Sequence, residues 1–130
     1  MNSMIALVAR ALLATLFVVA GVRKILAFPI VAGIMGAKGF PMPELFLALS
    51  IVLDIVGGLM LVLNWNARYA ALALAAYTLV IGAIFHGFWQ VWSAAPPEFA
   101  NEVNHFLKNL AVVGGLLLIV GQTNLEEKSA

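Results

Sequence analysis

The sequence predicts an all-α membrane protein: a four-transmembrane-helix bundle with up-down-up-down topology, forming a single domain over residues 1–130. Composition is the first reason. Of the 130 residues, 64% are hydrophobic and only 10% are charged, and the mean hydropathy is +1.06. Soluble domains carry about 25% charged residues, and a soluble domain of this size has too little interior for so much apolar surface. The second reason is that the apolar residues gather into four runs of near-spanning length.

The four runs predict spans at residues 4–22, 44–63, 67–85 and 106–121. The first competes with a cleaved signal peptide, but it lacks a positively charged start, so we expect an uncleaved helix. Only Asn64–Asn66 separate the second run from the third, which favours an antiparallel hairpin. The fourth run is short, so its polar beginning is expected near the membrane interface.

The other two connections are long and lie on one face of the predicted bundle, here called the long-loop face. Residues 23–43 contain prolines and glycines that interrupt regular helix, so this connection is either a loop or a short interfacial helix with turns. Trp65, Trp89 and Trp92 favour the headgroup region and are expected to anchor the interfaces. Lysine and arginine are balanced between the two faces, so the orientation in the membrane stays open.

Several kinds of chemistry are disfavoured by the sequence. The net charge is +1, which gives no basic field for nucleic acid, and the chain has no cysteine for disulfides, thiolate metal sites or thiol redox chemistry. His86 and His105 do not form an HxxxH or HExxH motif, so we expect no metal. There is no dinucleotide fingerprint, CxxC or haem motif, so no covalent cofactor is predicted.

An aspartate interrupts the apolar stretch LSIVLDIVGGLM, residues 49–60, near the middle of the second span. A charge at that depth costs roughly 2.5–3.5 kcal/mol on insertion scales, so Asp54 is expected to face the bundle. It would pair with Arg10 or Lys108, or be protonated and neutral. The simpler alternative is that Asp54 only ties helices together, because intramembrane polar contacts average about 0.6 kcal/mol.

Other polar residues are expected to collect near the long-loop face. Arg10, Ala14, Phe17, Gly21 and Lys24 form one stripe on the first helix, at three- and four-residue steps. Chain direction places Lys24, Glu44, His86, His105 and Lys108 toward that face. Each also has a structural explanation, as an interface anchor or a polar helix end.

The chain resembles the DoxX family of small bacterial membrane proteins over almost its whole length. The resemblance rests on LVARALLATLFVVAGVRKI, GFPMP, LDIVGGLMLVL, YTLVIGAIFHGFW and FLKNLAVVGGLLLIVG, in that order. It implies a multi-pass protein of the bacterial inner (plasma) membrane with a redox-linked role, since some relatives are subunits of thiosulfate:quinone oxidoreductases and others are tied to quinone or oxidative-stress resistance. It also implies that Arg10, Lys24, Asp54, His86, Lys108 and Asn109 are the family's recurring polar positions. Many members have Glu where this chain has Asp54.

The clustered polar residues and the resemblance to the DoxX family together predict binding of a quinone-like hydrophobic small molecule. The expected site is a polar pocket between helices near the long-loop face. Asp54 and His86 are the candidate catalytic residues, as a proton relay. The candidate substrate-binding residues are Arg10, Lys24, Lys108, Asn109, His105 and Trp89. Electrons would come from a redox partner protein or a bound reductant. Besides membrane lipid, a second copy of the chain is a possible partner, and no nucleic acid is expected.

Two other functions stay open. The chain is alternatively a non-catalytic membrane anchor or stabilising subunit of an oxidoreductase complex, with the polar residues used for assembly. A third function is a small carrier or exporter of toxic hydrophobic compounds, although one four-helix bundle shows no inverted repeat. Whether the protein is an enzyme is therefore left open by the sequence.

Overall fold

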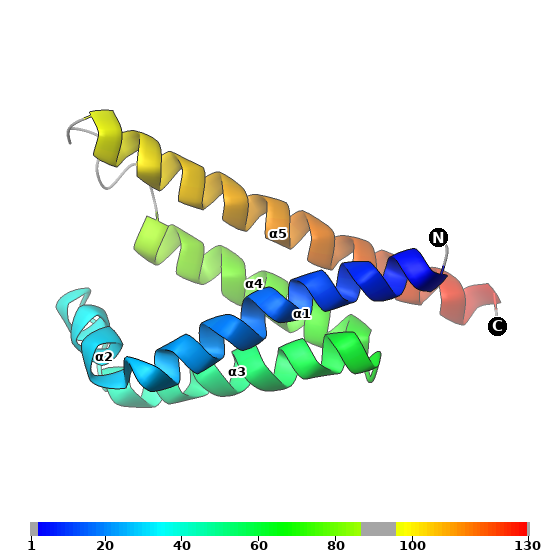
Figure 1. The fold of residues 1–130 in the computed structure, drawn as a ribbon, viewed down its shortest axis with the longest axis horizontal. Helices are drawn as coiled ribbons and strands as arrows, with labels where there is room; N and C mark the ends of the chain where they lie inside the picture. The colour runs from blue at the N-terminus through cyan, green and yellow to red at the C-terminus, as the bar shows by residue number, and fades with distance from the viewer. Residues whose placement is uncertain (1–2, 87–95, 130) are drawn as a thin grey trace. The chain divides into compact units, whose positions relative to one another are not determined.

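A computed structural model describes residues 3–86 and 96–129; for residues 85–86, 96–99 and 123–129 it describes the backbone only. Within this part the chain forms the helices α1 (Ser3–Leu26), α2 (Phe28–Ala37), α3 (Pro43–Leu63), α4 (Ala67–His86) and α5 (Pro96–Ser129) (Figure 1). The chain divides into two compact units, Met1–Ala70 and Ala71–Ala130, and each is described by itself.

Four of the described helices are long and apolar enough to cross a membrane. Their spanning segments are Ser3–Leu26, Pro43–Leu63, Ala67–Ile84 and Ala100–Gln122. At 1.5 Å per residue, 20 helical residues cover the roughly 30 Å of a bilayer's hydrocarbon core. The predicted class, an all-α membrane protein with four spanning helices, is thereby confirmed.

The connection between the first two spans contains a short helix. α2 begins after Ala27, with Pro29 in its first turn, where proline's missing N–H leaves no helical hydrogen bond unmade. Its ten residues cover about 15 Å, too short to span. Gly39 (φ 95°) and Met42 (φ 51°) adopt left-handed backbone in the turn that follows. Of the two alternatives for residues 23–43, the short helix with turns is therefore the one observed.

α3 has clear signals at both ends. Pro43 is its first residue, and Asn64 follows its last residue, Leu63. The left-handed conformation of Asn64 (φ 56°) lets the Asn64 and Trp65 N–H groups bond the carbonyls of Leu61 and Met60. Asn66 is also left-handed (φ 47°), and its carbonyl accepts the Tyr69 and Ala70 N–H groups at the start of α4. Asparagine tolerates this backbone region better than most residues do, which explains the Asn-Trp-Asn turn.

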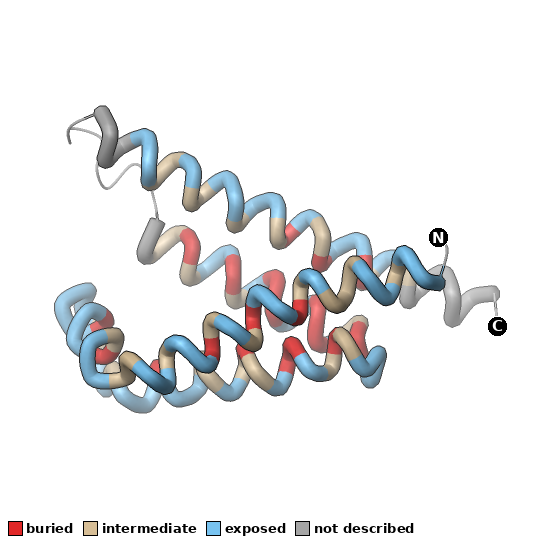
Figure 2. Tube along the Cα trace, viewed as in Figure 1, coloured by how far each residue is buried: buried red, intermediate tan, exposed pale blue. Residues whose placement is uncertain are grey.

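α1 and α3 pack closely because small residues lie between them. A Cβ atom at Gly21 would lie 2.6 Å from Ile55 Cγ1, and one at Gly58 would lie 2.8 Å from Val18 Cγ2 and 3.2 Å from the Ala14 carbonyl oxygen. Residue 21 thus faces 54–55 while residues 14–18 face 58, so the two helices are antiparallel. Figure 2 marks the buried residues along both helices. Small residues let helix backbones approach in this way in membranes, where lipid supplies no hydrophobic drive to associate.

α2 covers the part of α3 that lies beyond the end of α1. Ala32 and Met35 of α2 are buried, and the rings of Phe40 and Phe46 meet edge to face with centroids 5.7 Å apart. Leu47 in the second turn of α3 is fully buried. The segment before α3 therefore packs against part of its start, while Leu45 and Phe46 remain exposed.

In the second unit, α5 is longer than predicted. The sequence places a span at 106–121 with a polar first turn, whereas α5 begins at Pro96 and its spanning segment is Ala100–Gln122. His105 and Lys108 consequently lie well inside the helix. The prediction fails because it relied on hydropathy, which marks where a helix becomes apolar and carries no information on where its backbone hydrogen bonding starts.

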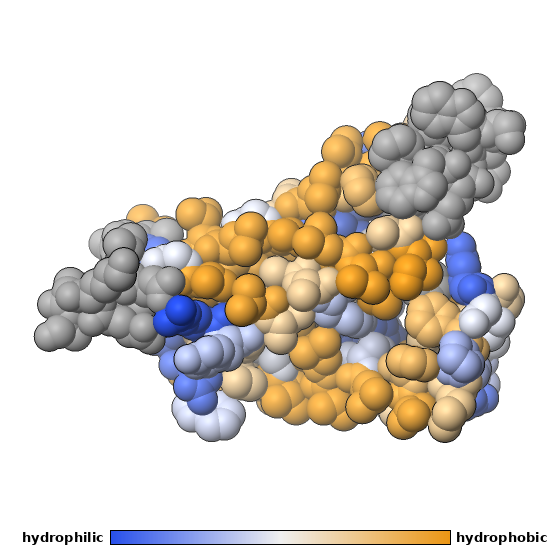
Figure 3. All heavy atoms as spheres, turned by 180° about the vertical axis from the view of Figure 1, so that it is seen from behind, coloured by the Kyte–Doolittle hydropathy of each residue, from blue (hydrophilic) through white to orange (hydrophobic). Residues whose placement is uncertain are grey.

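Most of the outer surface of the spanning helices is apolar. Figure 3 shows hydrophobic residues over much of the face that it displays. Two hydroxyl side chains within the spans bond their own helix: Thr15 Oγ1 donates to the Ala11 carbonyl and Ser50 Oγ to the Leu47 carbonyl, each at 2.8 Å. Such bonds satisfy a hydroxyl where no water is present.

Candidate functional site

The buried carboxylate of the second span has a lysine partner from the first. Lys24 Nζ donates to Asp54 Oδ2 at 2.7 Å, the length of a strong charge-assisted hydrogen bond. The Asp54 side chain is 1% exposed and the Lys24 side chain 24% exposed. The sequence analysis proposed Arg10 or Lys108 for this role, so the structure gives Asp54 a partner that was not proposed for it.

The local geometry explains why Lys24 reaches this carboxylate. Residue 21 faces 54–55, so Lys24 lies about one turn beyond Asp54 along the shared helix interface. Side chains on a helix lean toward its own N-terminus. Because α1 and α3 are antiparallel, Lys24 leans back toward Asp54 while Asp54 leans toward Lys24. Gly21 keeps the helices close enough for the two groups to meet.

The two partners differ in position along their helices. Asp54 lies near the middle of α3, whereas Lys24 lies in the last turn of α1. The pair therefore marks where α1 ends and α2 begins to cover α3. The Asp54 side chain is enclosed, whereas part of the Lys24 side chain is exposed.

Arg10 lies far from this pair. It is 14 residues before Lys24 on α1, or about 21 Å along the helix. Its Nε atom is buried and has no hydrogen-bond partner within the described part of the chain. The stripe predicted on α1 is real, since Ala14, Phe17 and Gly21 are its buried residues, but its two cations occupy opposite ends.

Asn109 packs against α4 in the second unit. A Cβ atom at Gly82 would lie 2.9 Å from Asn109 Nδ2 and 3.4 Å from Asn109 Cβ, so the amide occupies the space that a side chain at residue 82 would need. His105 and Asn109 are half-buried and Lys108 is exposed. Trp89 lies outside the described residues, as does the side chain of His86.

Comparison with known proteins now settles the family. A sequence profile described as DoxX matches residues 5–87. The chain belongs to the DoxX family. Among DoxX relatives, it is 36% identical over 115 residues to the inner membrane protein YqjF of Escherichia coli (strain K12), and 29% identical over 114 residues to the inner membrane protein YphA of the same organism. Each match covers 87% of this chain and 79% of the relative. No solved structure matches the chain.

Two predictions about this DoxX chain are confirmed by these matches and the four spanning helices. The resemblance stated from its sequence motifs is correct, and the chain is a multi-pass bacterial inner-membrane protein. The Lys24–Asp54 pair lies within the part that the DoxX profile matches, whereas His105, Lys108 and Asn109 lie beyond it.

One polar residue of the DoxX chain was missed by sequence reasoning. Thr78 is 8% exposed, and its Oγ1 has no hydrogen-bond partner among the described residues. It lies one turn before Gly82 on α4, on the same face. The sequence does contain a signal for Thr78: it lies four residues before a glycine in a helix that is otherwise rich in Ala and Leu. A single hydroxyl is a weaker sequence signal than a charged side chain.

The described residues offer no group of three or more His, Cys, Asp or Glu side chains arranged to hold a metal ion. What the first unit does offer is a carboxylate with an ammonium group beside it in apolar surroundings. Such a pair binds a polar atom of a ligand by hydrogen bonding or exchanges a proton with it.

Proposed function

We propose that this DoxX protein binds a quinone-like hydrophobic small molecule next to the Lys24–Asp54 pair and has a redox-linked role in the inner membrane. The single observation that supports it is an ion pair in which the carboxylate is 1% exposed and the ammonium group 24% exposed. The enclosed carboxylate holds the ammonium group in place, and the partly exposed ammonium group is a donor that a ligand headgroup can reach.

The chemistry of a quinone fits this donor. A quinone carbonyl accepts hydrogen bonds, and its oxygen becomes more negative on reduction, so Lys24 would stabilise the reduced form more than the oxidised one. Asp54 would hold the ammonium group in place and take up or release a proton. Formation of a quinol needs two electrons and two protons, and the electrons would be supplied by a redox partner protein. The roles assigned to His86, His105, Lys108, Asn109 and Trp89 rest on the sequence alone and stay predictions.

Quinone binding is tested on the purified protein by titration with ubiquinone and with menaquinone, followed by tryptophan fluorescence. Wild type is compared with Lys24→Met, Asp54→Asn and the control Lys38→Met, which removes an exposed lysine after α2. We expect saturable quenching by wild type and the control, and at least tenfold weaker binding by the other two variants. A tenfold change corresponds to about 1.4 kcal/mol, a modest value for a charged hydrogen bond.

Thermal melting in the same detergent separates binding from folding. If wild type is stable but shows no saturable quenching, the quinone proposal is wrong, and the pair serves structure alone. A protein that responds only when an oxidoreductase subunit is added would instead be an anchor or stabilising subunit.

A further inference from the structure

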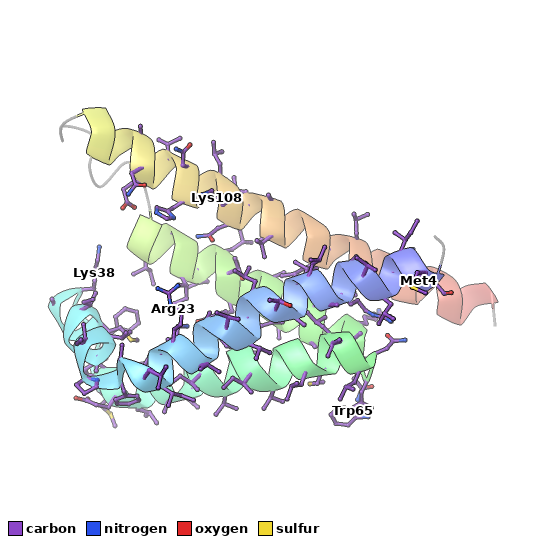
Figure 4. The ribbon with its side chains drawn as sticks, in the orientation of Figure 1. Met4, Arg23, Lys38, Trp65 and Lys108 are labelled. Atoms are coloured by element: carbon purple, nitrogen blue, oxygen red, sulfur yellow. The ribbon has the colours of Figure 1, made fainter. Side chains whose placement is uncertain are left out.

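The end of the first unit opposite the Lys24–Asp54 pair carries two arginines. Ala14 faces Gly58, so Arg10, one turn earlier on α1, is level with the end of α3 and the turn into α4. Arg68 belongs to the first turn of that next helix. Figure 4 shows Met4 of α1 and Trp65 of the turn toward this same end. Two guanidinium groups thus belong to the same end of the unit.

Arg10 has a buried hydrogen-bond donor that lacks an acceptor within the described residues. That donor is the Nε of its guanidinium group. A buried donor without a partner is costly, and more so when it carries charge. Residues 1–70 contain two carboxylates, and neither is available here: Glu44 lies at the start of α3, and Asp54 near its middle bonds Lys24. Neither carboxylate of this unit therefore pairs with Arg10.

The surroundings indicate what kind of anion reaches this end. Trp65 and Tyr69 are each 64% exposed, and the Arg68 guanidinium carbon lies 5.8 Å from the centre of the Tyr69 ring. Exposed Trp and Tyr at the ends of spanning helices lie at the level of lipid headgroups. The first turn of α4 contains no acidic residue, so the positive end of its helix dipole adds to both arginines. The phosphate of a lipid headgroup is an anion available at that depth.

We propose that Arg10 and Arg68 bind the phosphate of an anionic phospholipid headgroup, with Trp65 and Tyr69 against the adjoining part of the lipid. Arg10 supplies the inner donor from α1 and Arg68 the outer donor from α4. Guanidinium groups match phosphate oxygens with paired N–H donors, so arginine suits this role better than lysine does. This site is separate from the proposed quinone site, at the other end of the α1–α3 interface.

The test uses Trp65 as the reporter. In full-length protein carrying Trp89→Phe and Trp92→Phe, Trp65 is the remaining tryptophan. Vesicles containing brominated phosphatidylglycerol or brominated phosphatidylcholine quench it when the lipid lies beside it. We expect phosphatidylglycerol to quench at a lower mole fraction than phosphatidylcholine. Arg10→Gln should weaken relative phosphatidylglycerol binding about fivefold, the effect of one basic residue at an anionic surface.

Arg23→Gln is the matched control, because Arg23 is an exposed arginine near the other end of the same helix (Figure 4). It should leave the preference at Trp65 unchanged. Equal quenching by the two lipids, or equal losses in Arg10→Gln and Arg23→Gln, would overturn the proposal. Displacement of phosphatidylglycerol by millimolar inorganic phosphate would also overturn it, since the site would then serve free phosphate.

Two further variants keep the test decisive if Arg10→Gln does not fold. Arg10→Lys retains the charge and should retain most of the preference for phosphatidylglycerol. Arg68→Gln alters the helix start and should lower the preference about as much as Arg10→Gln. An unchanged preference in Arg68→Gln would contradict a site shared by the two arginines.

Discussion

Lys24 and Asp54 join α1 to α3 through a charged hydrogen bond, 2.7 Å from Nζ to Oδ2, although Lys24 lies at the end of its helix and Asp54 near the middle of its own. The offset arises because α1 ends about halfway along α3. The carboxylate is thus reached from a helix end, where the chain turns into α2. A ligand would approach Lys24 by the same route.

Breaking the pair from one side should cost more stability than removing both partners. Lys24→Met leaves the enclosed Asp54 carboxylate without its ammonium partner, and we expect the free energy of unfolding to fall by about 3 kcal/mol. The double variant Lys24→Met/Asp54→Leu should recover most of that loss. Unfolding in mixed detergent micelles measures both, with Lys38→Met as the control. Strictly additive losses would show that the two side chains do not interact.

Gly21 should be the least tolerant glycine of the first unit toward alanine. The new methyl would lie 2.6 Å from Ile55 Cγ1 and 3.2 Å from Asp54 Cβ, so α1 and α3 must move apart. We expect Gly21→Ala to cost about 1–3 kcal/mol and to weaken ligand binding at Lys24. Gly33→Ala on α2 meets nothing within 4 Å and should stabilise by about 0.5–1 kcal/mol. Similar melting shifts for the two variants would argue against close α1–α3 packing.

Asn109 and Gly82 should behave as a coupled pair. Gly82→Ala places a methyl 2.9 Å from Asn109 Nδ2, and the amide must rotate away, at a cost of about 1 kcal/mol. In an Asn109→Ala background the same substitution should cost almost nothing. Gly114→Ala, which meets nothing within 4 Å, is the control on α5. A double-mutant cycle by thermal melting measures the coupling, and a coupling energy of zero would contradict the contact.

Thr78 provides a test for an unseen partner. Its hydroxyl is buried without a partner among the described residues, so Thr78→Val should raise the free energy of unfolding by about 1 kcal/mol. Thr15→Val, at an exposed hydroxyl that bonds its own helix, is the comparison. If Thr78→Val instead loses stability or weakens quinone binding, the hydroxyl has a ligand or water partner in the working protein.

Much of the fold follows from the sequence because the bilayer restricts which backbone conformations are possible. Every backbone polar group inside lipid must be bonded, so apolar runs of about 20 residues become helices whatever their neighbours are. That is why the spans at 44–63 and 67–85 agree closely with α3 and with α4. Helix ends in the interface escape this constraint. The sequence therefore placed the start of the last helix too late, since α5 begins at Pro96. It also left open whether residues 28–37 form a helix or a loop.

The sequence by itself determined that this is a four-span membrane protein of the DoxX family with a carboxylate deep in its second span. Only the tertiary structure decided which cation meets that carboxylate. Arg10, Lys24 and Lys108 are equivalent by charge and periodicity, but the partner depends on the register between α1 and α3. That register is set by Gly21 and Gly58, which let two backbones approach, and a shift of one turn would move Lys24 about 5.4 Å. Hydropathy cannot encode a contact that depends on which small residues lie opposite each other.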